Sequence, residues 1–326
     1  MRSYGIKRSG DSISLELCDT PVPNPGSNQV LIRVHAAGLN RGEFIVGHGV
    51  HAKAMTIKVG GGEGSGEVVK LGAGVKKMKV GARVMGRCIG AFAEYSLMDV
   101  SDVMLVPPNL SWQEAAATPL TFAVVYDMLV MQGRLGPNES LLVTGISSGV
   151  GVAALQTAKA LGARVIGTSG SSDKIKRLKE LGLNVGLCTR DADFYDDVMD
   201  ATQGKGVNLV VNTVGGSMFT ECVRSLAFEG RLATVGYVDG QMKSEIDIEA
   251  LHSKRLTLFG VSNKLRTPEQ RAHTVADFVT DILPMFADGR IRPIIDKIYP
   301  FDQLLAAKIY MESNLHLGKI VISIPA

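Results

Sequence analysis

The chain has 326 residues, a formal net charge of +3 and four cysteines. So small a charge, without a long run of lysine or arginine, argues against a nucleic-acid or membrane-surface partner. The four cysteines are Cys18, Cys88, Cys188 and Cys222; they lie far apart and form no C-x-x-C pair, which favours reduced thiols over a disulfide framework or a zinc finger. No leader segment and no apolar run of roughly 18 residues is visible. We therefore expect a cytoplasmic protein without a membrane span, long enough for two domains.

The first third of the chain is rich in predicted strands and glycine turns. Alternating apolar residues predict strands over residues 30–37, 64–71 and 82–85. Turns are predicted at residues 72–74 and 79–81. This pattern predicts a small β-barrel.

The pattern changes at Ser111. Residues 112–129 have a helical pattern, Ser111 is a candidate N-cap, and Glu114 completes a capping box. Strands and helices then alternate, as a parallel doubly wound sheet requires. The later strands of this sheet are expected at residues 207–212, 230–236 and 255–260.

The C-terminal part belongs to neither sheet by its order in the sequence. Helices are expected over residues 268–288 and 302–313, followed by a last strand over residues 319–324. We expect this part to fold back onto the first domain.

The most informative segment is residues 141–161, LLVTGISSGVGVAALQTAKAL, in which an apolar strand enters a glycine-serine turn that opens into a helix. In a dinucleotide site Gly145 would make the tight turn, Gly149 would let the backbone approach a pyrophosphate, and Gly151 would let the helix pack closely. The glycine spacing departs from the standard G-x-G-x-x-G, so the context carries the prediction. A strand over residues 163–169 and a helix over residues 171–181 complete one βαβ unit. The other residues of the turn expected at the phosphates are Ser147, Ser148 and Val150.

The end of the second strand indicates which dinucleotide is bound. An NAD site usually has Asp or Glu about 20 residues after the glycines, whereas the 2′-phosphate of NADP needs small or basic residues there. Ser169 and Ser171 can donate hydrogen bonds to a phosphate, and Lys174 can supply a positive charge. The sequence therefore favours NADPH. The alternative is that Ser171 only caps the helix and that Lys174 is a solvated helix residue.

Several short motifs follow one another in an order that resembles the medium-chain dehydrogenase/reductase superfamily, and within it the zinc-independent quinone oxidoreductase and enoyl reductase branch. They are AAGLN at residues 36–40, GEGSG at 62–66, AFAEY at 91–95, SSGVG at 147–151, VGG at 214–216, GRL at 230–232 and HLGKIV at 316–321. The resemblance covers nearly the whole chain. It implies a GroES-like β-barrel domain over residues 1–118 and 265–326 and a Rossmann domain over residues 119–264, with nicotinamide and substrate in the cleft between them.

The resemblance also implies that the protein is metal-free. In the zinc alcohol dehydrogenases of the superfamily, cysteine, histidine and cysteine stand at or near the positions of Asn40, Gly62 and Leu120. Catalytic zinc needs about three ligands from cysteine, histidine or carboxylate. These three residues supply none of them.

The same resemblance implies further cofactor contacts. Asn40 would lie beside the nicotinamide ribose or ring, and Lys319 would make a contact at the rim of the site. The remaining expected contacts come from Asn212, which stands where an aspartate is common, and from Val235, Gly236, Tyr237, Phe259, Gly260 and Val261. The structural alternatives are that Asn40 only caps a turn and that Gly236 and Gly260 only permit close packing.

Without a metal as Lewis acid, hydride transfer to a quinone or an α,β-unsaturated carbonyl compound is the expected reaction. The tyrosines common in this branch are replaced by Ile45 and His51. We expect His51 to donate a hydrogen bond to the developing oxyanion, with Tyr126 or solvent as the other proton source. The alternative for His51 is a solvated loop residue.

Two other functions stay open. An enoyl-thioester or haloacrylate-type reductase is favoured if Arg41 and Lys53 form a basic entrance. An NADPH-binding sensor without turnover is the alternative from a different class.

The strand at residues 255–260 predicts a homodimer, because an apolar strand at the edge of a sheet invites pairing with a second chain. The alternative is that a C-terminal helix covers this edge.

Overall fold

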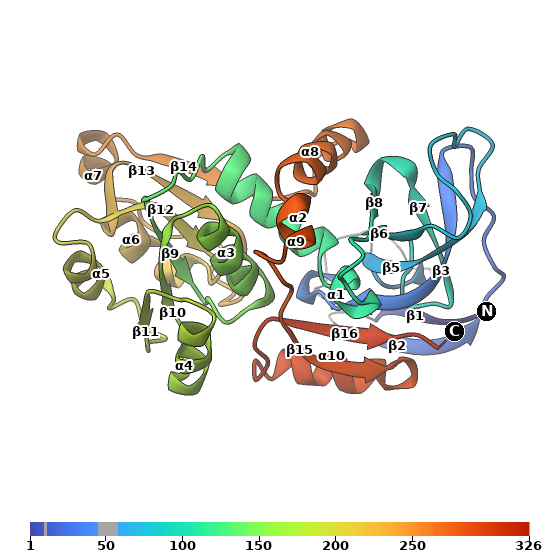
Figure 1. Ribbon diagram of the computed structural model, residues 1–326. Coiled ribbons are helices and arrows are strands. Elements are labelled where there is room, and N and C mark those ends of the chain that lie inside the picture. Colours follow the sequence, from blue (N-terminus) through green and yellow to red (C-terminus); the bar gives the residue numbers. More distant parts are fainter. Residues whose placement is uncertain (10–11, 45–57, 326) are drawn as a thin grey trace. The chain divides into compact units, whose positions relative to one another are not determined.

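The computed structural model describes residues 1–9, 12–44 and 58–325 (Figure 1). The chain divides into two compact units. The first unit consists of residues 1–123 and 266–326, and the second of residues 124–265.

The first unit contains two sheets. One has the strand order β2-β1-β4, and the other has the order β15-β16-β3-β5-β6-β8, with β7 paired to β3 off this path. The strands are β1 (Arg2–Ser9), β2 (Ser12–Asp19), β3 (Gln29–Gly38), β4 (Lys58–Val59), β5 (Glu63–Leu71), β6 (Arg83–Arg87), β7 (Tyr95–Asp99), β8 (Val103–Leu105), β15 (Ile295–Pro300) and β16 (Lys319–Ser323). The C-terminal strand β16 pairs antiparallel with β3, so this part does return to the first sheet, as expected.

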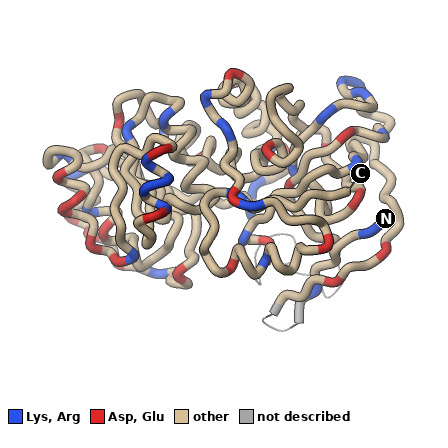
Figure 2. Tube along the Cα trace, turned by 60° about the horizontal axis from the view of Figure 1, so that its bottom comes forward, with Lys and Arg blue, Asp and Glu red and all other residues tan. Residues whose placement is uncertain are grey.

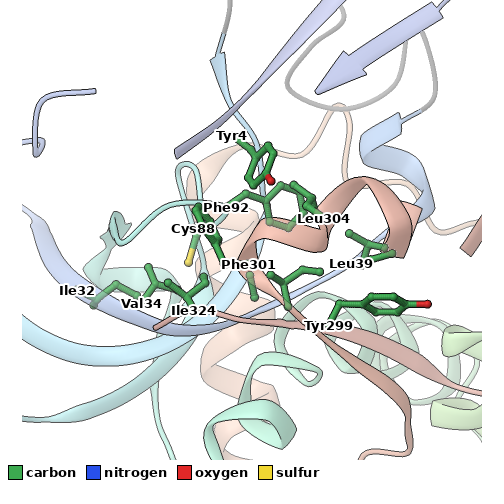
Figure 3. Packing of buried hydrophobic residues seen from close by; sticks show 14 of the residues in the cluster. Tyr4, Ile32, Val34, Leu39, Cys88, Phe92, Tyr299, Phe301, Leu304 and Ile324 are labelled. Carbon is green, nitrogen blue, oxygen red and sulfur yellow. The ribbon is translucent and has the colours of Figure 1, made fainter. Parts of the chain in front are cut away.

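The core of the first unit surrounds β3. Ile32 and Val34 of this strand are fully buried and belong to a cluster that also contains Phe92, Phe301 and Leu304 (Figure 3). Leu39, directly after β3, lies in the same cluster and is 4% exposed. Burial of Leu39 therefore anchors the backbone immediately before Asn40.

The second unit is built on a six-stranded sheet in which each pair of neighbouring strands is parallel. Its order is β11-β10-β9-β12-β13-β14, so the chain order reverses between β9 and β12. In open sheets of this kind, ligands bind beyond the carboxyl ends of the strands at such a point. The strands are β9 (Ser140–Thr144), β10 (Arg164–Thr168), β11 (Val185–Leu187), β12 (Val207–Asn212), β13 (Leu226–Thr234) and β14 (Thr257–Gly260).

Helices connect these strands, as the alternating pattern predicts. In the second unit they are α3 (Gly149–Ala160), α4 (Ser172–Glu180), α5 (Tyr195–Ala201), α6 (Gly216–Arg224) and α7 (Ile248–Ser253). The first unit has the short turns η1 (Arg41–Phe44), η3 (Val100–Asp102) and η5 (Phe301–Gln303), and a helix α10 (Leu304–Glu312).

Two helices predicted as continuous are interrupted. The capping box of Ser111 and Glu114 is confirmed, but residues 112–129 form α1 (Trp112–Ala116), α2 (Pro119–Tyr126) and a π-helical turn that begins at Asp127. Residues 268–288 likewise divide into α8 (Pro268–Asp281) and α9 (Leu283–Ala287). Pro119 starts α2 and disfavours helix at the preceding residue, Thr118, whereas Pro284 lies in the first turn of α9 and has no N–H to donate to a carbonyl of α8.

Both signs of charge are distributed along each unit (Figure 2). No helix in the described part of the chain is long and apolar enough to cross a membrane.

Candidate functional site

The glycine turn after β9 has the conformation that a phosphate-binding turn needs. Gly145 has φ +63°, and a Cβ atom there would lie 2.7 Å from Thr213 Oγ1. A Cβ atom on Gly151 would lie 2.5 Å from the carbonyl oxygen of Ile146. Gly145 is therefore needed for the left-handed turn and Gly151 for the close approach of α3 to that turn.

Helix α3 begins directly after this turn. The Ser148 hydroxyl caps the helix and accepts a hydrogen bond from Gly151 N at 3.1 Å. The first N–H groups of a helix have no intrahelical acceptors and lie at the positive end of its dipole. A turn of this kind offers backbone donors that suit a pyrophosphate, and binding at these residues stays a prediction.

Serine side chains connect this turn with the end of β10. Ser169 is 5% exposed, and its hydroxyl donates to Ser147 Oγ at 3.4 Å. Ser171 caps α4 by accepting from Lys174 N at 3.4 Å, so the capping alternative holds for its position. A serine hydroxyl that accepts one bond can still donate its own proton, so capping is compatible with phosphate binding.

Arg190 was missed by the sequence analysis, although it lies beside the predicted 2′-phosphate residues. A Cβ atom on Gly170 would overlap the side chain of Arg190. Ser169 N donates to Leu187 O at 3.0 Å, which holds the ends of β10 and β11 together. Its position in the sequence could have indicated this, because Arg190 follows β11 by three residues. Neighbouring parallel strands end at the same edge of a sheet, so residues just after β10 and β11 lie close together.

Asn212, at the end of β12, organises the turn that follows it. Its Oδ1 accepts from Thr144 Oγ1 at 3.0 Å, Val214 N at 3.0 Å and Gly215 N at 3.1 Å, and its Nδ2 donates to Gly215 O at 2.8 Å. The side chain is fully buried. Both polar atoms of the Asn212 side chain are therefore hydrogen-bonded within the protein. A contact between Asn212 and the cofactor stays a prediction.

The other predicted cofactor residues follow β13 and β14. Close packing does not explain Gly260, because a Cβ atom there would meet no described atom within 4 Å. At Gly236 the nearest described atom to such a Cβ would be Thr213 O, at 3.3 Å. Val261 is 6% exposed and donates its N–H to Thr234 O, so it joins the ends of the two strands. The remaining residues of these segments are Val235, Tyr237 and Phe259.

A second group of predicted site residues forms a buried charged cluster in the first unit. Lys319 Nζ donates to Glu63 Oε1 at 2.7 Å, to Asn40 Oδ1 at 2.8 Å and to Leu39 O at 3.1 Å. Lys319 is 6% exposed, so its side chain is enclosed by this cluster, and its contact with the cofactor at the rim of the site stays a prediction. Lys319 is the first residue of β16, whose pairing with β3 draws it inside, and all three ammonium donors have acceptors.

Glu63 connects three elements of this cluster. It is fully buried, and its Oε2 accepts from Leu120 N at 2.8 Å, at the start of α2. A carboxylate is favoured there by the helix dipole. A Cβ atom on Gly38 would overlap Glu63 Oε1, so Gly38 is needed for the carboxylate to reach its position.

Asn40 holds a second carboxylate, Glu43 of η1, in the same cluster. Asn40 Nδ2 donates to Glu63 Oε1 at 2.8 Å and to Glu43 Oε1 at 3.1 Å. Its Oδ1 faces the Lys319 ammonium, which settles the orientation of the amide. The Asn40 side chain therefore does more than cap a turn.

Glu43 differs from Glu63 in being partly exposed. Its Oε2 accepts from Gly61 N at 3.1 Å. Burial raises the pKa of Glu43 to about 7; the Asn40 hydrogen bond opposes the shift and the negative charge of Glu63 adds to it. Glu43 was not a predicted site residue, and nothing in its local sequence distinguishes it from a solvated turn residue.

The three positions compared with zinc ligands come together around the Glu43 carboxyl group. A Cβ atom on Gly62 would lie 3.3 Å from Leu120 Cδ1 and 3.7 Å from Glu43 Oε1, and Asn40 contacts Glu43 directly. Glycine and leucine have no donor atom for zinc, and the Asn40 amide is held between an ammonium and two carboxylates. The residues at these positions therefore do not fit a zinc ion. Nor does the described chain contain a group of three or more His, Cys, Asp or Glu residues that could hold a metal.

The other predicted catalytic residues are His51 and Tyr126. His51 lies outside the described residues, as does Ile45. Tyr126 is the last residue of α2 and is 3% exposed.

Family comparisons match both parts of the chain. Residues 26–108 match the alcohol dehydrogenase GroES-like domain, and residues 149–280 match the zinc-binding dehydrogenase family. A phenolphthiocerol/phthiocerol polyketide synthase of Mycobacterium tuberculosis is 32% identical over 322 residues, which is 98% of this chain and 15% of that protein. The chain thus spans only a small part of the polyketide synthases that it matches.

Solved structures resemble the chain over its full length. Mycobacterial Rv1454c complexed with NADPH is 28% identical, with a TM-score of 0.87 and 99% of both chains covered. A mycobacterial quinone oxidoreductase is 27% identical, with a TM-score of 0.85 over 99% of both chains. CurK enoyl reductase is 26% identical, again with a TM-score of 0.85 over 99% of both chains.

Proposed function

The chain belongs to the medium-chain dehydrogenase/reductase superfamily, and we propose that it is an NADPH-dependent reductase of quinones or α,β-unsaturated carbonyl compounds. The observation that carries the proposal is the turn between β9 and α3. There Gly145, Ser148 and Gly151 form a turn at the N-terminus of α3, in which the Ser148 cap uses the Gly151 N–H and the backbone of Gly149 and Val150 precedes it in the first helical turn.

The residues at the end of β10 favour NADPH over NADH. No carboxylate follows the strand directly, whereas Ser169, Ser171, Lys174 and Arg190 supply hydroxyl and basic groups there. These are the groups that bind a 2′-phosphate. The likeness to Rv1454c, which was solved with NADPH, supports the same choice.

Bound NADPH supplies a hydride, and the chain must stabilise the negative charge that the acceptor gains and then provide a proton. Asn40 offers a hydrogen-bonded amide, Gly62 has no side chain, and the side chain of Leu120 is apolar. Such a site favours acceptors that need no Lewis acid. A quinone or an enone is of this kind, because delocalisation spreads the charge.

An enoyl thioester is the second candidate acceptor. It contains the same conjugated carbonyl group, and the likeness to CurK enoyl reductase and to a polyketide synthase favours it. A haloacrylate-type acceptor differs from a quinone, an enone and an enoyl thioester in that its reacting part carries a negatively charged carboxylate. A sensor that binds NADPH without turnover is the alternative outside catalysis.

One experiment separates these functions. NADPH and NADH oxidation is measured with a quinone, an enone, an enoyl thioester and a haloacrylate, each with product analysis. We expect NADPH-dependent reduction of the quinone or the enone. Tight NADPH binding without turnover on any acceptor would establish the sensor instead, and absence of nucleotide binding would contradict both.

A further inference from the structure

The Glu43 carboxyl group is placed differently from every other member of the charged cluster. Glu63 and Lys319 are buried and paired with each other, with their side chains 0% and 6% exposed. Glu43 has hydrogen bonds from Asn40 Nδ2 and Gly61 N but is partly exposed. Of the two carboxyl groups in the described part of this cluster, Glu43 is the one that belongs to a partly exposed residue, and each of its oxygens accepts a hydrogen bond.

The charges of the cluster make protonated Glu43 favourable. Lys319 and Glu63 form an ion pair at 2.7 Å, so the cluster is neutral when Glu43 carries a proton. Ionised Glu43 would add an unbalanced negative charge beside Glu63, in surroundings of low polarity. Burial and the Glu63 charge accordingly raise the pKa of Glu43 to about 7, although the Asn40 amide and the Lys319 charge lower it. A carboxylic acid with such a pKa can donate and regain a proton near neutral pH.

We propose that Glu43 supplies the proton that completes reduction of the acceptor, and that Asn40, Glu63 and Lys319 position it. The inference rests on the proposed function. Reduction adds a hydride from NADPH to the acceptor and leaves an enolate or a phenolate. The Glu43 O–H bond then breaks while a C–H bond forms at the enolate carbon, or an O–H bond forms at the quinol oxygen. Water returns a proton to Glu43.

The neighbours of Glu43 suit this role. After proton transfer, the carboxylate keeps the Asn40 and Gly61 N–H groups as donors, which stabilise its charge. Asn40 cannot turn its amide without placing its oxygen against two carboxylates and its NH2 group against the Lys319 ammonium. The donor to Glu43 is therefore fixed in direction.

The first test is a titration of the free protein, without cofactor or acceptor. Glutamate side chains are labelled with ¹³C, and Glu43 is assigned by the loss of its signal in Glu43→Gln and, independently, in Glu43→Asp. We expect its carboxyl signal to titrate near pH 7, and at higher pH in Asn40→Leu, which lacks the hydrogen bond that lowers the pKa. Titration of the native carboxyl at its ordinary value of 4.5 would overturn the inference whatever the activity of the protein.

The second test is the pH profile of turnover. With native protein, kcat should fall as pH rises through about 7, because the protonated carboxyl is the active form. Glu43→Gln should lower kcat by roughly 10²-fold or more and abolish this decline, with the Kd for NADPH unchanged. Glu43→Asp keeps an ionisable acid and should retain a pH-dependent part of the activity. Glu67→Gln, on strand β5 with Glu63 but outside the cluster, is the control and should behave as native protein.

The outcomes separate the two proposals. Native turnover that persists at full rate in Glu43→Gln, with the same pH profile, would overturn the role of Glu43 and leave the proposed reductase intact. Absence of turnover by native protein on every acceptor would overturn both. If Glu43→Gln does not fold, the titration of native protein and the profile of Glu43→Asp still decide the question.

Discussion

Two basic residues near the end of β10 offer a direct test of cofactor preference. Lys174 lies in the first turn of α4, and Arg190 lies against Gly170. We expect native protein to bind NADPH more tightly than NADH, and Lys174→Ala or Arg190→Ala each to narrow the difference by roughly 1 to 3 kcal/mol, as for a charge-assisted phosphate contact. Fluorescence titration with both nucleotides measures this. The exposed Lys176→Ala is the control, and equal affinity of native protein for the two nucleotides would contradict the prediction.

His51 lies outside the described residues, but its proposed role as oxyanion donor can be tested independently. We expect His51→Phe to lower kcat by about 10²-fold with little change in NADPH affinity, because the donor acts in the transition state. A histidine of ordinary pKa, about 6.5, would also make turnover fall as pH rises. Steady-state kinetics of the His51 and Glu43 variants show which substitution removes that decline. Near-native kcat in His51→Phe with an unchanged pH profile would leave His51 without a catalytic role.

Glu43 should also make the stability of the protein depend on pH in an unusual direction. Its folded-state pKa of about 7 lies above its ordinary value of 4.5, so the folded protein binds the proton more tightly than the unfolded chain between these values. The free energy of unfolding should therefore fall as pH rises from about 4.5 to about 7, by up to roughly 3 kcal/mol. Above about pH 7, Glu43 should cause no further loss of stability.

Urea unfolding of native protein and Glu43→Gln at about pH 5 and about pH 8 measures this contribution. We expect the variant to gain stability relative to native protein at the higher pH, because glutamine does not ionise. An equal difference between the two proteins at both pH values would show that Glu43 has no raised pKa.

At the scale of elements, the sequence predicts best those features that depend on neighbouring residues. The strand, turn and helix around Gly145 follow from a local pattern, and so does the capping box at Ser111. The helix breaks were also local signals, at Pro119 and Pro284, but the apolar periodicity continues through them and misled the prediction. The hairpin of β1 and β2 was not predicted, because its residues are largely polar.

The charged cluster could not be predicted in the same way. Lys319 lies 256 positions from Glu63 and 279 from Asn40, and only the pairing of β16 with β3 brings them together. Asn40 and Lys319 were predicted as separate contacts through resemblance, without their mutual hydrogen bond. The raised pKa of Glu43 depends on burial by this packing, which no local pattern reveals.

Strand β14 carries the prediction of a homodimer. It is the last strand in the order of the six-stranded sheet, and in the described part of the chain it pairs with β13 alone. An unpaired strand edge favours pairing with a second chain about a twofold axis. We expect light scattering at micromolar concentration to give twice the mass of the chain. A monomeric mass at that concentration would contradict this prediction.

At the scale of the whole molecule, each unit contributes a different part of the proposed reaction. The second unit has the glycine turn and the basic residues that suit NADPH, whereas the first has the cluster that holds Glu43. A polyketide synthase that is 32% identical to the chain is spanned by it over 15% of its length.

Hydride transfer itself is the central claim, and isotope labelling tests it most directly. The protein is incubated with NADPH deuterated at the transferable position and with the best enone found, and the product is examined by mass spectrometry and NMR. We predict one deuterium per product molecule at the β-carbon, with a proton from water at the α-carbon and one NADPH consumed per product formed. A product without deuterium, or NADPH oxidation without reduced product, would contradict the assignment of this protein as a hydride-transferring reductase.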